Sequence, residues 1–598
     1  MLLGYLTYSD KIDPKEKRLF DQTLLETSFP EGILESYQYD RLIISIARHT
    51  AFHQSPAHIY NYTDANIVII LVGSIFHYQN SEVKPTDLDE LLLCEYSALG
   101  VDFLSDVNGE FSICIFDFAQ DKYLFGKDHI GTVPMTIIKD ENGVFFGTDM
   151  NGMAKSIFKD EKIEDDYIYS RFYGYGENYR CTPFSGIQKV LPAHFIEISD
   201  KRMVQSSYWS TKSIQINESI DFETAVNTLE KLTKDAVKVR IKDGYTVGSH
   251  YSGGIDSSIV AGMTREACGN QEEFYGFSWS PEDYIFKGNS KLDERILIRE
   301  QAAKSSILPV FINTNIEDFI AFLSDWRAQP DFHYETPTQK EAQKKGINLL
   351  FSGWGGDEFI GIPKAATHME LFKKRKFRKF FKNSKKQSFK GKIVHLYNNV
   401  IFPFRRTPSF RLKSGKRVAK YLRLDNNLQE NKREIFSSKN RYLQHLMSYR
   451  HNAQRCETWY TSGQRNGVEY TFPLLDKRII EYCFSLNVEL FAETNMNKPL
   501  LRAIGKEYLI DKIRLEKQLF DPVLIAHEKE LDRQSLELLT LEFQDFKQNP
   551  YLSFVNFEKI EADINAIGSN DSSISNDIAH ILSYLKSVHS YTLNVGNH

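Results

Sequence analysis

The stretch YTVGSHYSGGIDSS, residues 245–258, joins a short apolar run to a glycine turn and the start of a helix. Val247 and Tyr251 suit a buried strand, and segment 259–266 has helical character. Gly253 and Gly254, in the turn between them, let backbone N–H groups approach an oxyanion closely. The dipole of the following helix also favours negative charge at this point. The stretch therefore predicts an anion cradle between a strand and a helix.

Four polar residues of this turn indicate which anion it binds. Ser252, Ser257 and Ser258 supply hydroxyl donors, whereas Asp256 would repel a phosphate and is suited to hold Mg²⁺ beside one. No lysine follows the second glycine, so the turn is not a Walker A motif. The turn resembles the pyrophosphate loop of the ATP pyrophosphatase superfamily. That resemblance implies an enzyme that splits ATP into AMP and pyrophosphate to activate a carboxylate or a carbonyl oxygen as its adenylate.

The composition is that of an ordinary globular protein and limits its class. The chain has 598 residues, too many for one hydrophobic core, which predicts two or more domains. Its net charge of −5 gives no reason to expect a nucleic-acid partner. The six cysteines form no CxxC pair, which argues against zinc and a disulfide framework and favours a cytoplasmic location. We recognise no signal peptide and no apolar run of membrane-spanning length.

Residues 1–205 have mainly β character, with strand-like runs that include 66–76 and 111–118. Three segments resemble the N-terminal glutamine-hydrolysing domain of asparagine synthetases, namely 108–111, 127–134 and 145–149. The resemblance implies a glutaminase-like, Ntn-type αββα sandwich.

Two departures from this resemblance concern the glutaminase site. The family's nucleophile is a cysteine directly after the initiator methionine, whereas this chain has Leu2 and its first cysteine is Cys94. The family's glutamine-binding Asn-Gly-Glu corresponds here to Val72, Gly73 and Ser74. Without a thiolate no acyl-enzyme forms. We therefore predict that residues 1–205 are a catalytically inactive structural partner of a synthetase domain over residues 206–598.

The synthetase region alternates strands and helices. Strand-like runs follow the first turn at 273–280, 310–312 and 348–351, which predicts a doubly wound α/β domain with its ligand at the carboxyl ends of a parallel sheet. The last run ends in SGWGGDE, residues 352–358, a second glycine turn with carboxylates. We expect Asp256 and Asp357 to bind the same Mg²⁺ ion.

The second turn resembles the SGEGSDE segment of asparagine synthetases, and we expect Gly353, Trp354 and Gly355 to line the nucleotide site. The family's glutamate at the third position is Trp354 here. β-Lactam synthetases carry tyrosine there, and lasso-peptide macrolactam synthetases commonly carry tryptophan. Both groups also lack the glutaminase cysteine, so the resemblance is nearest to them.

Three further candidate catalytic residues are identified by their resemblance to family motifs. Lys498 lies in a segment similar to the family's KxxLR, and Lys517 lies in one similar to RxKxxFxD. A fixed ammonium stabilises the negative charge that builds up during adenylation. We assign this role to Lys517, and we expect Lys498 to assist by contacting phosphate. Glu457 has about the spacing of the glutamate that pairs with tyrosine in β-lactam synthetases. It is therefore a candidate general base for an attacking amine.

The segment from about residue 371 to 420 has a different composition from the rest. It contains eighteen Lys or Arg between Leu371 and Lys420 and no acidic residue, with phenylalanines interleaved. Three interpretations stay open: a solvated surface insertion, a docking site for an acidic partner or peptide, and contact with an anionic membrane surface.

These features predict a two-step ligase that uses ATP and Mg²⁺. A carboxylate is adenylated, and an amine then displaces AMP to form an amide. Trp354 favours a lasso peptide cyclase, which adenylates an Asp or Glu side chain of a precursor peptide and closes a macrolactam with the peptide's N-terminal amine. A leader peptidase or a leader-binding protein would then be a partner. The alternative is an ammonia-dependent asparagine synthetase-like amidotransferase that acts on a small-molecule carboxylate.

Overall fold

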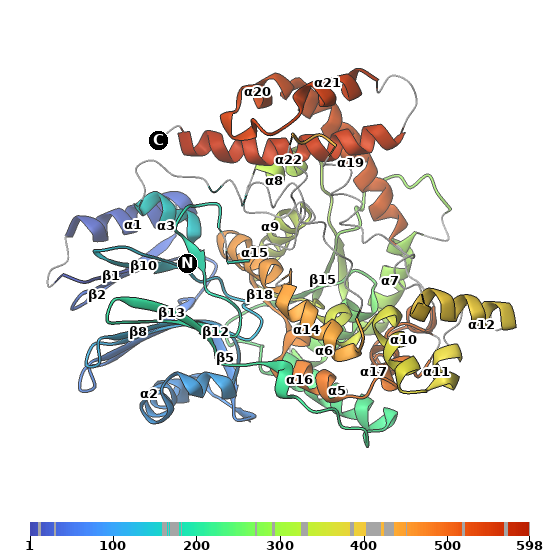
Figure 1. The fold of residues 1–598 in the computed structure, drawn as a ribbon, viewed down its shortest axis with the longest axis horizontal. Coiled ribbons are helices and arrows are strands. Elements are labelled where there is room, and N and C mark those ends of the chain that lie inside the picture. Colours follow the sequence, from blue (N-terminus) through green and yellow to red (C-terminus); the bar gives the residue numbers. More distant parts are fainter. Residues whose placement is uncertain are drawn as a thin grey trace.

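Two domains lie against each other in the computed structural model (Figure 1). The structure describes residues 1–9, 14–28, 32–157, 164, 167, 179–180, 182–269, 272–289, 293–324, 333–382, 388–401, 420–423, 436–449, 451–494, 496–516, 521–566 and 572–596. The N-terminal domain is built on two stacked sheets, and the other domain is built on one parallel sheet with helices.

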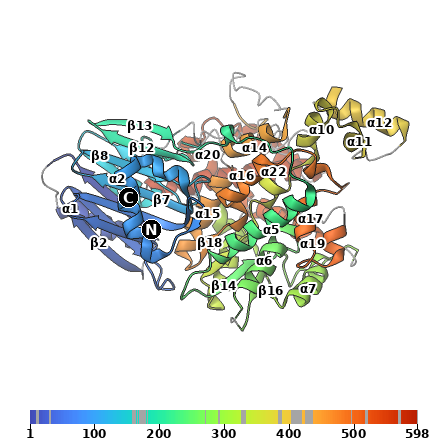
Figure 2. The same cartoon turned by 90° about the horizontal axis from the view of Figure 1, so that it is seen from below.

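Both sheets of the N-terminal domain are antiparallel (Figures 1 and 2). The first has the strand order β11-β9-β10-β1-β3-β2, and the second has the order β13-β12-β8-β7-β5-β4, with β6 paired to β5. The strands are β1 (Leu2–Thr7), β2 (Ile33–Tyr39), β3 (Leu42–Arg48), β4 (Ala57–Tyr62), β5 (Ile67–Tyr78), β6 (Ser81–Glu82), β7 (Val107–Asp117), β8 (Lys122–Lys127), β9 (Thr136–Lys139), β10 (Gly143–Gly147), β11 (Gln188–Lys189), β12 (His194–Ser199) and β13 (Arg202–Ser207).

The sequence of β5 explains why the sheets stack between helices. Its side chains alternate between two hydrophobic clusters, as the period of a strand requires. Val68 and Ile70 pack into the core between the sheets. Ile69 and Leu71 pack on the opposite face with helix α2 (Leu88–Leu99). Helices α1 (Pro14–Ser28) and α3 (Met150–Ile157) cover the outer face of the first sheet, so the predicted αββα sandwich is confirmed.

Five parallel strands form the sheet of the second domain, in the order β16-β15-β14-β17-β18. They are β14 (Val247–His250), β15 (Tyr275–Ser278), β16 (Leu308–Phe311), β17 (Leu349–Phe351) and β18 (Glu469–Thr471). The chain adds β15 and β16 on one side of β14, and β17 and β18 on the other. The strand order therefore reverses between β14 and β17, which is where sheets of this kind bind ligands. The predicted doubly wound domain is confirmed.

Helices surround this sheet. Helix α6 (Ile255–Ala267) packs on β14 and β17, α7 (Glu294–Ser305) on β16, and α15 (His451–Arg465) on β18. The other helices of the sheet domain are α5 (Phe222–Lys238), α8 (Ile316–Ser324), α9 (Glu335–Lys344), α14 (Lys439–Tyr449), α16 (Lys477–Ser485), α17 (Pro499–Ile504) and α18 (Asp511–Leu515). A C-terminal layer with its own core, above the sheet in Figure 1, contains α19 (Pro522–Leu541), α20 (Phe543–Gln548), α21 (Phe557–Ala566) and α22 (Ser572–Gly596).

The described part of the basic segment is helical. It contains the end of α10 (Lys364–Lys373), then α11 (Phe377–Lys382) and α12 (Phe389–Leu396), which continues as a π-helix to residue 401. Among the described helices, none is both long enough and apolar enough to cross a membrane. The last strand of the N-terminal sheets ends at Ser207, and the domain boundary between residues 205 and 206 stays a prediction.

Candidate active site

The two glycine turns meet at the point where the strand order reverses. Residues 252–254 follow β14 and residues 352–356 follow β17, its parallel neighbour. Helix α6 begins at Ile255, four residues before the predicted helical segment, with Gly254 at its N-cap. Asp256 therefore lies in the first helical turn, where backbone N–H groups have no partner within the helix. The predicted cradle is thus a helix N-terminus that faces the second turn.

The hydroxyls of the first turn order its backbone. Ser252 Oγ lies 2.9 Å from Ser257 Oγ, and the Gly254 N–H donates to Ser252 Oγ at 3.3 Å. Gly253 has a φ of 72°, a left-handed conformation that strains other residues. The turn is therefore held in its shape by its own residues.

Two glycines of the second turn are required because it touches the first. A Cβ on Gly353 would lie 2.5 Å from the Ser257 backbone nitrogen. A Cβ on Gly356 would lie 2.5 Å from Cγ of Asp256. Any larger residue at either position would push the two turns apart.

Asp256 and Asp357 converge on one cationic side chain. Nζ of Lys498 lies 2.8 Å from Oδ2 of Asp256 and 2.8 Å from Oδ1 of Asp357. Lys498 is the N-cap of α17 and has a φ of 56°. The structure thus brings together both predicted metal ligands and one predicted catalytic lysine, while their roles stay predictions.

The pKa values at this site depend on burial and on the neighbouring charges. Burial raises the pKa of Asp256 to about 6, although Lys498 opposes that shift. Burial also raises the pKa of Glu358 to about 7, and the charges of Asp357 and Asp256 add to the effect. Glu358 accepts a hydrogen bond from the N–H of Gly355 at 3.1 Å, and that bond holds the second turn together. The site therefore has an excess of carboxylates over cations, which favours a bound divalent ion.

The residues present fit a Mg²⁺ ion that shares its ligands with ATP. Two buried oxygens, Asp256 Oδ1 and Ser258 Oγ, have no hydrogen-bond partner among the described residues. Protein sites hold Mg²⁺ with one or two carboxylates, while phosphates and water complete its octahedron. Over the described part of the chain, no cluster of three or more His, Cys, Asp or Glu could hold a metal alone. Asp256 and Asp357 match the smaller donor set that a Mg-ATP site needs.

The side chain of Trp354 extends from the second turn to helix α15. Its Nε1–H donates to Oδ1 of Asn452 at 3.1 Å, and the guanidinium of Arg455 lies 3.9 Å from its ring centroid. This cation–π contact holds the indole beside the turn. Trp354 thus occupies a position where it can shape the space next to a bound nucleotide.

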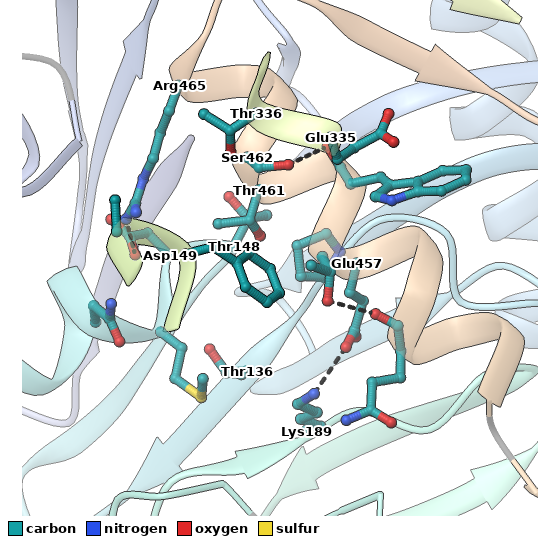
Figure 3. A pocket seen from close by; sticks show the side chains of 18 of the residues that line it. Thr136, Thr148, Asp149, Lys189, Glu335, Thr336, Glu457, Thr461, Ser462 and Arg465 are labelled. Carbon is teal, nitrogen blue, oxygen red and sulfur yellow. Dashed lines mark hydrogen bonds and ion pairs between the residues drawn. The ribbon is translucent and has the colours of Figure 1, made fainter. Parts of the chain in front are cut away.

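Glu457 lies on α15 and points toward the N-terminal domain (Figure 3). Its carboxylate pairs with Nζ of Lys127 at 2.5 Å and with Nζ of Lys189 at 2.8 Å. Tyr179 donates a further hydrogen bond to it at 2.5 Å. Burial opposes ionisation, but the two lysines lower the pKa of Glu457 to about 2. The geometry indicates that Glu457 links the two domains, and its role as a general base stays a prediction.

A pocket of about 240 Å³ adjoins this link (Figure 3). The N-terminal domain lines it with Thr136, Thr148 and Asp149, and the other wall includes Trp459 and Arg465 of α15. The pocket therefore lies between the two domains, and the ring centroid of Trp459, which lines it, is 6.3 Å from that of Trp354.

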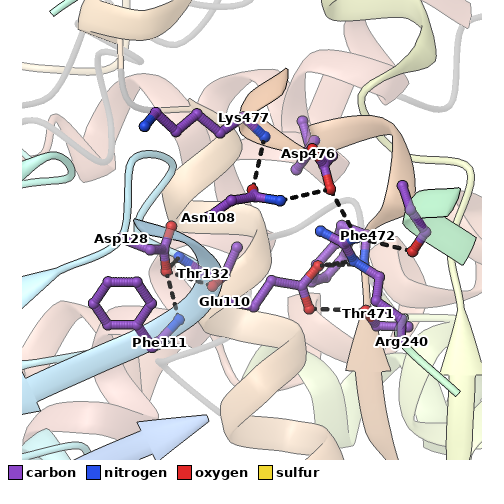
Figure 4. Close-up of polar contacts among 12 residues, drawn as sticks. Asn108, Glu110, Phe111, Asp128, Thr132, Arg240, Thr471, Phe472, Asp476 and Lys477 are labelled. Atoms are coloured by element: carbon purple, nitrogen blue, oxygen red, sulfur yellow. Dashed lines mark hydrogen bonds and ion pairs between the residues drawn. The ribbon is translucent and has the colours of Figure 1, made fainter. Parts of the chain in front are cut away.

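A buried polar network also joins the domains (Figure 4). Nε of Arg240 donates to Oε1 of Glu110 at 2.9 Å, and its Nη1 donates to Oδ2 of Asp476 at 3.0 Å. Asn108 donates to the same Asp476 oxygen at 3.0 Å. Asn108 and Glu110 belong to a segment that resembles the glutaminase domain, so that segment serves here to fix one domain to the other.

The glutaminase position holds an apolar core residue. The side chain of Leu2 is fully buried in the cluster between the two sheets. Its backbone N–H donates to Oγ1 of Thr148 at 2.9 Å. Leu2 is therefore part of the core between the sheets, and the inactivity of the N-terminal domain stays a prediction.

Lys517, the predicted transition-state lysine, lies outside the described residues. The helix after its segment, α19, begins at Pro522, and the N–H groups of Val523 and Leu524 donate to Glu294 at 3.1 and 3.0 Å. Glu294 also accepts a hydrogen bond from Ser280, which follows β15, at 3.0 Å. The start of α19 is therefore tied through Glu294 to the carboxyl end of β15.

Sequence reasoning missed a buried trio beside the first turn. His250, the last residue of β14, bonds through Nε2 to Oε1 of Glu335 at 2.8 Å. The hydroxyl of Tyr470 donates to the same oxygen at 2.6 Å. The only sequence signal was a polar residue at a strand end, which is too common to single out His250.

Together the sandwich and the paired turns define a class of protein, a glutaminase-like domain fused to a doubly wound synthetase-type domain. The chain belongs to the asparagine synthase family, because the family model described as asparagine synthase matches residues 228–538, just over half of it. A second model, described as a glutamine amidotransferase domain, matches residues 55–209.

Curated relatives carry asparagine synthetase names. A Methanocaldococcus jannaschii protein named for glutamine-hydrolyzing asparagine synthetase is 28% identical over 316 residues, which cover 50% of this chain and 59% of the relative. Asparagine synthetase 2 (glutamine-hydrolyzing) of Bacillus subtilis is 25% identical over 34% of this chain and 30% of its own length. Asparagine synthetase B (glutamine-hydrolyzing) of Escherichia coli is 23% identical over 46% of each chain. The chain thus spans between 30% and 59% of the length of these relatives.

Proposed function

We propose that this chain is an ATP-dependent, AMP-forming ligase that joins a carboxylate to an amine. The observation that carries the proposal is the meeting of Asp256, Asp357 and Lys498 at the switch point of a parallel sheet, beside two glycine turns. This arrangement combines donors for phosphate oxygens with ligands for a divalent ion. Family membership supports the same class of chemistry.

Each residue of the site has a distinct role in this proposal. The N-terminus of α6 and the hydroxyls of Ser252 and Ser258 bind phosphate oxygens. Asp256 and Asp357 hold Mg²⁺, which neutralises phosphate charge when ATP is bound. On ATP binding, Lys498 moves from the carboxylates toward a phosphate oxygen. Lys517 stays our candidate for stabilising the adenylation transition state.

Leu2 removes glutamine as the nitrogen source. With an apolar, fully buried side chain at the nucleophile's position, ammonia cannot be released through an acyl-enzyme. The amine therefore comes from solution or from the substrate itself.

Two candidate carboxylate substrates are supported by different observations. The names of the relatives favour amidation of a small-molecule carboxylate, here with free ammonia. Trp354, held by Asn452 and Arg455, favours a macrolactam synthetase that closes a peptide ring, because it replaces the family's glutamate. The pocket of about 240 Å³ between the domains is also far larger than ammonia needs. In the peptide case a leader peptidase or a leader-binding protein would act on the same precursor.

The test is a product analysis with purified protein and Mg-ATP. One reaction contains aspartate and ammonium, and the other contains a leaderless peptide with an internal Asp or Glu. Pyrophosphate release with a new amide on aspartate supports the small-molecule acceptor. A peptide product that has lost one water supports the macrolactam. ADP in place of AMP would count against the ligase proposal itself.

A further inference from the structure

A basic helical projection extends from the synthetase domain at α11 and α12 (Figures 1 and 2). We call residues 371–382 and 388–401 the basic knob. Both views show α11 and α12 at the edge of the molecule, far from the N-terminal domain. The knob takes no part in the site described above.

The inner face of the knob is packed and anchored. Phe380 is fully buried, and its ring centroid lies 4.7 Å from that of His395 of α12. Lys376 and Lys379 form ion pairs with Glu489 and Glu493, two residues of the main body, at 2.5 and 2.7 Å. The knob is therefore a folded part of the domain, and some of its positive charge serves to attach it.

The outer face of α12 exposes large apolar side chains. Phe389 is 80% exposed, Ile393 is 51% exposed and Val394 is 44% exposed. The spacing of four residues between Phe389 and Ile393 puts them on one face of the helix. Clustered exposure of this kind has an energetic cost in water, which indicates a partner that covers the face.

Several cations of the basic knob are not neutralised. Within the described residues, Lys390 and Lys392 of α12 form no ion pair, and neither do Lys373, Arg375 and Arg378 elsewhere in the knob. The whole segment from 371 to 420 contains no acidic residue. Lys390 lies on α12 directly beside Phe389. The knob therefore combines a surplus of positive charge with an apolar ridge, formed by Phe389, Ile393 and Val394 on α12.

We propose that the basic knob docks on an anionic phospholipid surface. Phe389, Ile393 and Val394 enter the interfacial layer, and the free cations pair with headgroups. An acidic peptide would be recognised by the cations alone, whereas the exposed apolar side chains of α12 suit the interfacial layer of a lipid surface. This docking does not depend on the proposed ligase activity.

Vesicle flotation with the full chain tests this assignment. The vesicles contain phosphatidylcholine alone or phosphatidylcholine with about one-third phosphatidylserine. We expect binding only to the anionic vesicles, and weaker binding as salt is raised. The double variant Lys390→Glu/Lys392→Glu should weaken binding by at least about tenfold, since each surface cation contributes about a fivefold effect. Phe389→Ser/Ile393→Ser should weaken it by at least about tenfold through lost apolar burial.

Controls separate lipid docking from misfolding and from binding to an acidic polypeptide. Leu541, 82% exposed on α19, provides a matched control, and Leu541→Ser should bind like the parent chain. Unfolding temperatures of the knob variants should equal that of the parent, because Phe389, Lys390 and Ile393 are exposed and Lys392 is half-buried without an ion pair. Equal binding to both vesicle types, no binding, or unchanged binding of the knob variants would overturn the assignment. Tight binding to polyglutamate without vesicle binding would assign the knob to an acidic polypeptide instead.

Discussion

Nζ of Lys498 lies 2.8 Å from Oδ2 of Asp256, although 242 residues separate the two in sequence. The contact joins the start of α17 to the first turn of α6, and Asp357 of the second glycine turn shares the same ammonium. Burial alone would lower the pKa of Lys498, but the two carboxylates raise it above its ordinary value. The lysine is therefore a permanent cation at the site.

Removal of that cation should impair catalysis. Lys498→Ala leaves two carboxylates facing each other and removes a donor for phosphate. We expect pyrophosphate release to fall by about 10²–10³-fold, the usual effect of losing one preorganised electrostatic group. Lys506→Ala, an exposed lysine eight residues later, is the matched control and should change the rate less than twofold. A similarly small change in Lys498→Ala would refute the role.

The pH dependence should follow Asp256. Its pKa is raised to about 6, so the carboxyl is protonated below that pH and cannot hold Mg²⁺. We expect kcat/KM for Mg-ATP to be level above about pH 6 and to fall tenfold per unit below it. The fall in kcat should begin at lower pH, because bound Mg²⁺ favours the ionised form. A kcat/KM profile that stays flat down to pH 4 would exclude Asp256 as a ligand.

The contact between the turns should tolerate no side chain at residue 353. Gly353→Ala places a methyl group 2.5 Å from the Ser257 nitrogen and forces the turns apart. We expect at least a hundredfold loss of pyrophosphate release, since positioning errors of this size are costly. Gly346→Ala is the control: it has a φ of 72° and open space around it, so only backbone strain of about 1 kcal/mol is added. Equal activities of the two variants would argue against a close contact.

Glu457 should matter for folding and for the attachment of α15. Glu457→Gln leaves Lys127 buried with too little negative charge, which should lower the free energy of unfolding by about 3–5 kcal/mol. The exposed pair of Glu341 and Lys344 offers a control, and Glu341→Gln should cost less than about 0.5 kcal/mol. Denaturant unfolding measures both values.

The contribution of Glu457 to the free energy of unfolding should depend on pH. Because the folded pKa of Glu457 is about 2 and its ordinary value is 4.5, its stabilisation is complete above pH 4.5 and is lost as pH falls toward 2. The difference in stability between the parent chain and Glu457→Gln should therefore shrink over that range. A general base would instead show as a catalytic pH limb that disappears in Glu457→Gln.

Trp354, although expected to line the nucleotide site, should affect the carboxylate substrate far more than ATP. Trp354→Ala removes the stacking with Arg455 and opens the space beside the second turn. We expect KM for the carboxylate substrate to rise at least about tenfold, as for loss of a buried aromatic contact, with KM for ATP within twofold. Steady-state kinetics with each substrate varied in turn provides the comparison. An effect on ATP alone would place Trp354 in the nucleotide site.

Much of the fold could be predicted from the sequence because its signals are local. The glycine turns at 252–254 and 352–356, each after an apolar run, were sufficient to predict neighbouring parallel strands with converging carboxylates. The start of α6 was predicted four residues late, because the first helical turn carries polar residues that serve the site and not the core.

The rest required the three-dimensional structure. The partners of Glu457, Lys127 and Lys189, are 330 and 268 residues away in sequence. No local pattern encodes such pairings. The same holds for Glu110 and Arg240, whose contact fixes the N-terminal domain to the synthetase domain.

Equilibrium binding of ATP with and without Mg²⁺ is the most direct test of the central claim, because it needs no knowledge of the acceptor. Isothermal titration of the parent chain should show Mg²⁺-dependent binding that Asp256→Asn weakens by about a hundredfold or more, in line with loss of a metal ligand. Asp545→Asn, an exposed change on α20, should bind like the parent. Absence of ATP binding, or binding that neither Mg²⁺ nor Asp256 affects, would contradict a nucleotide site at the paired turns.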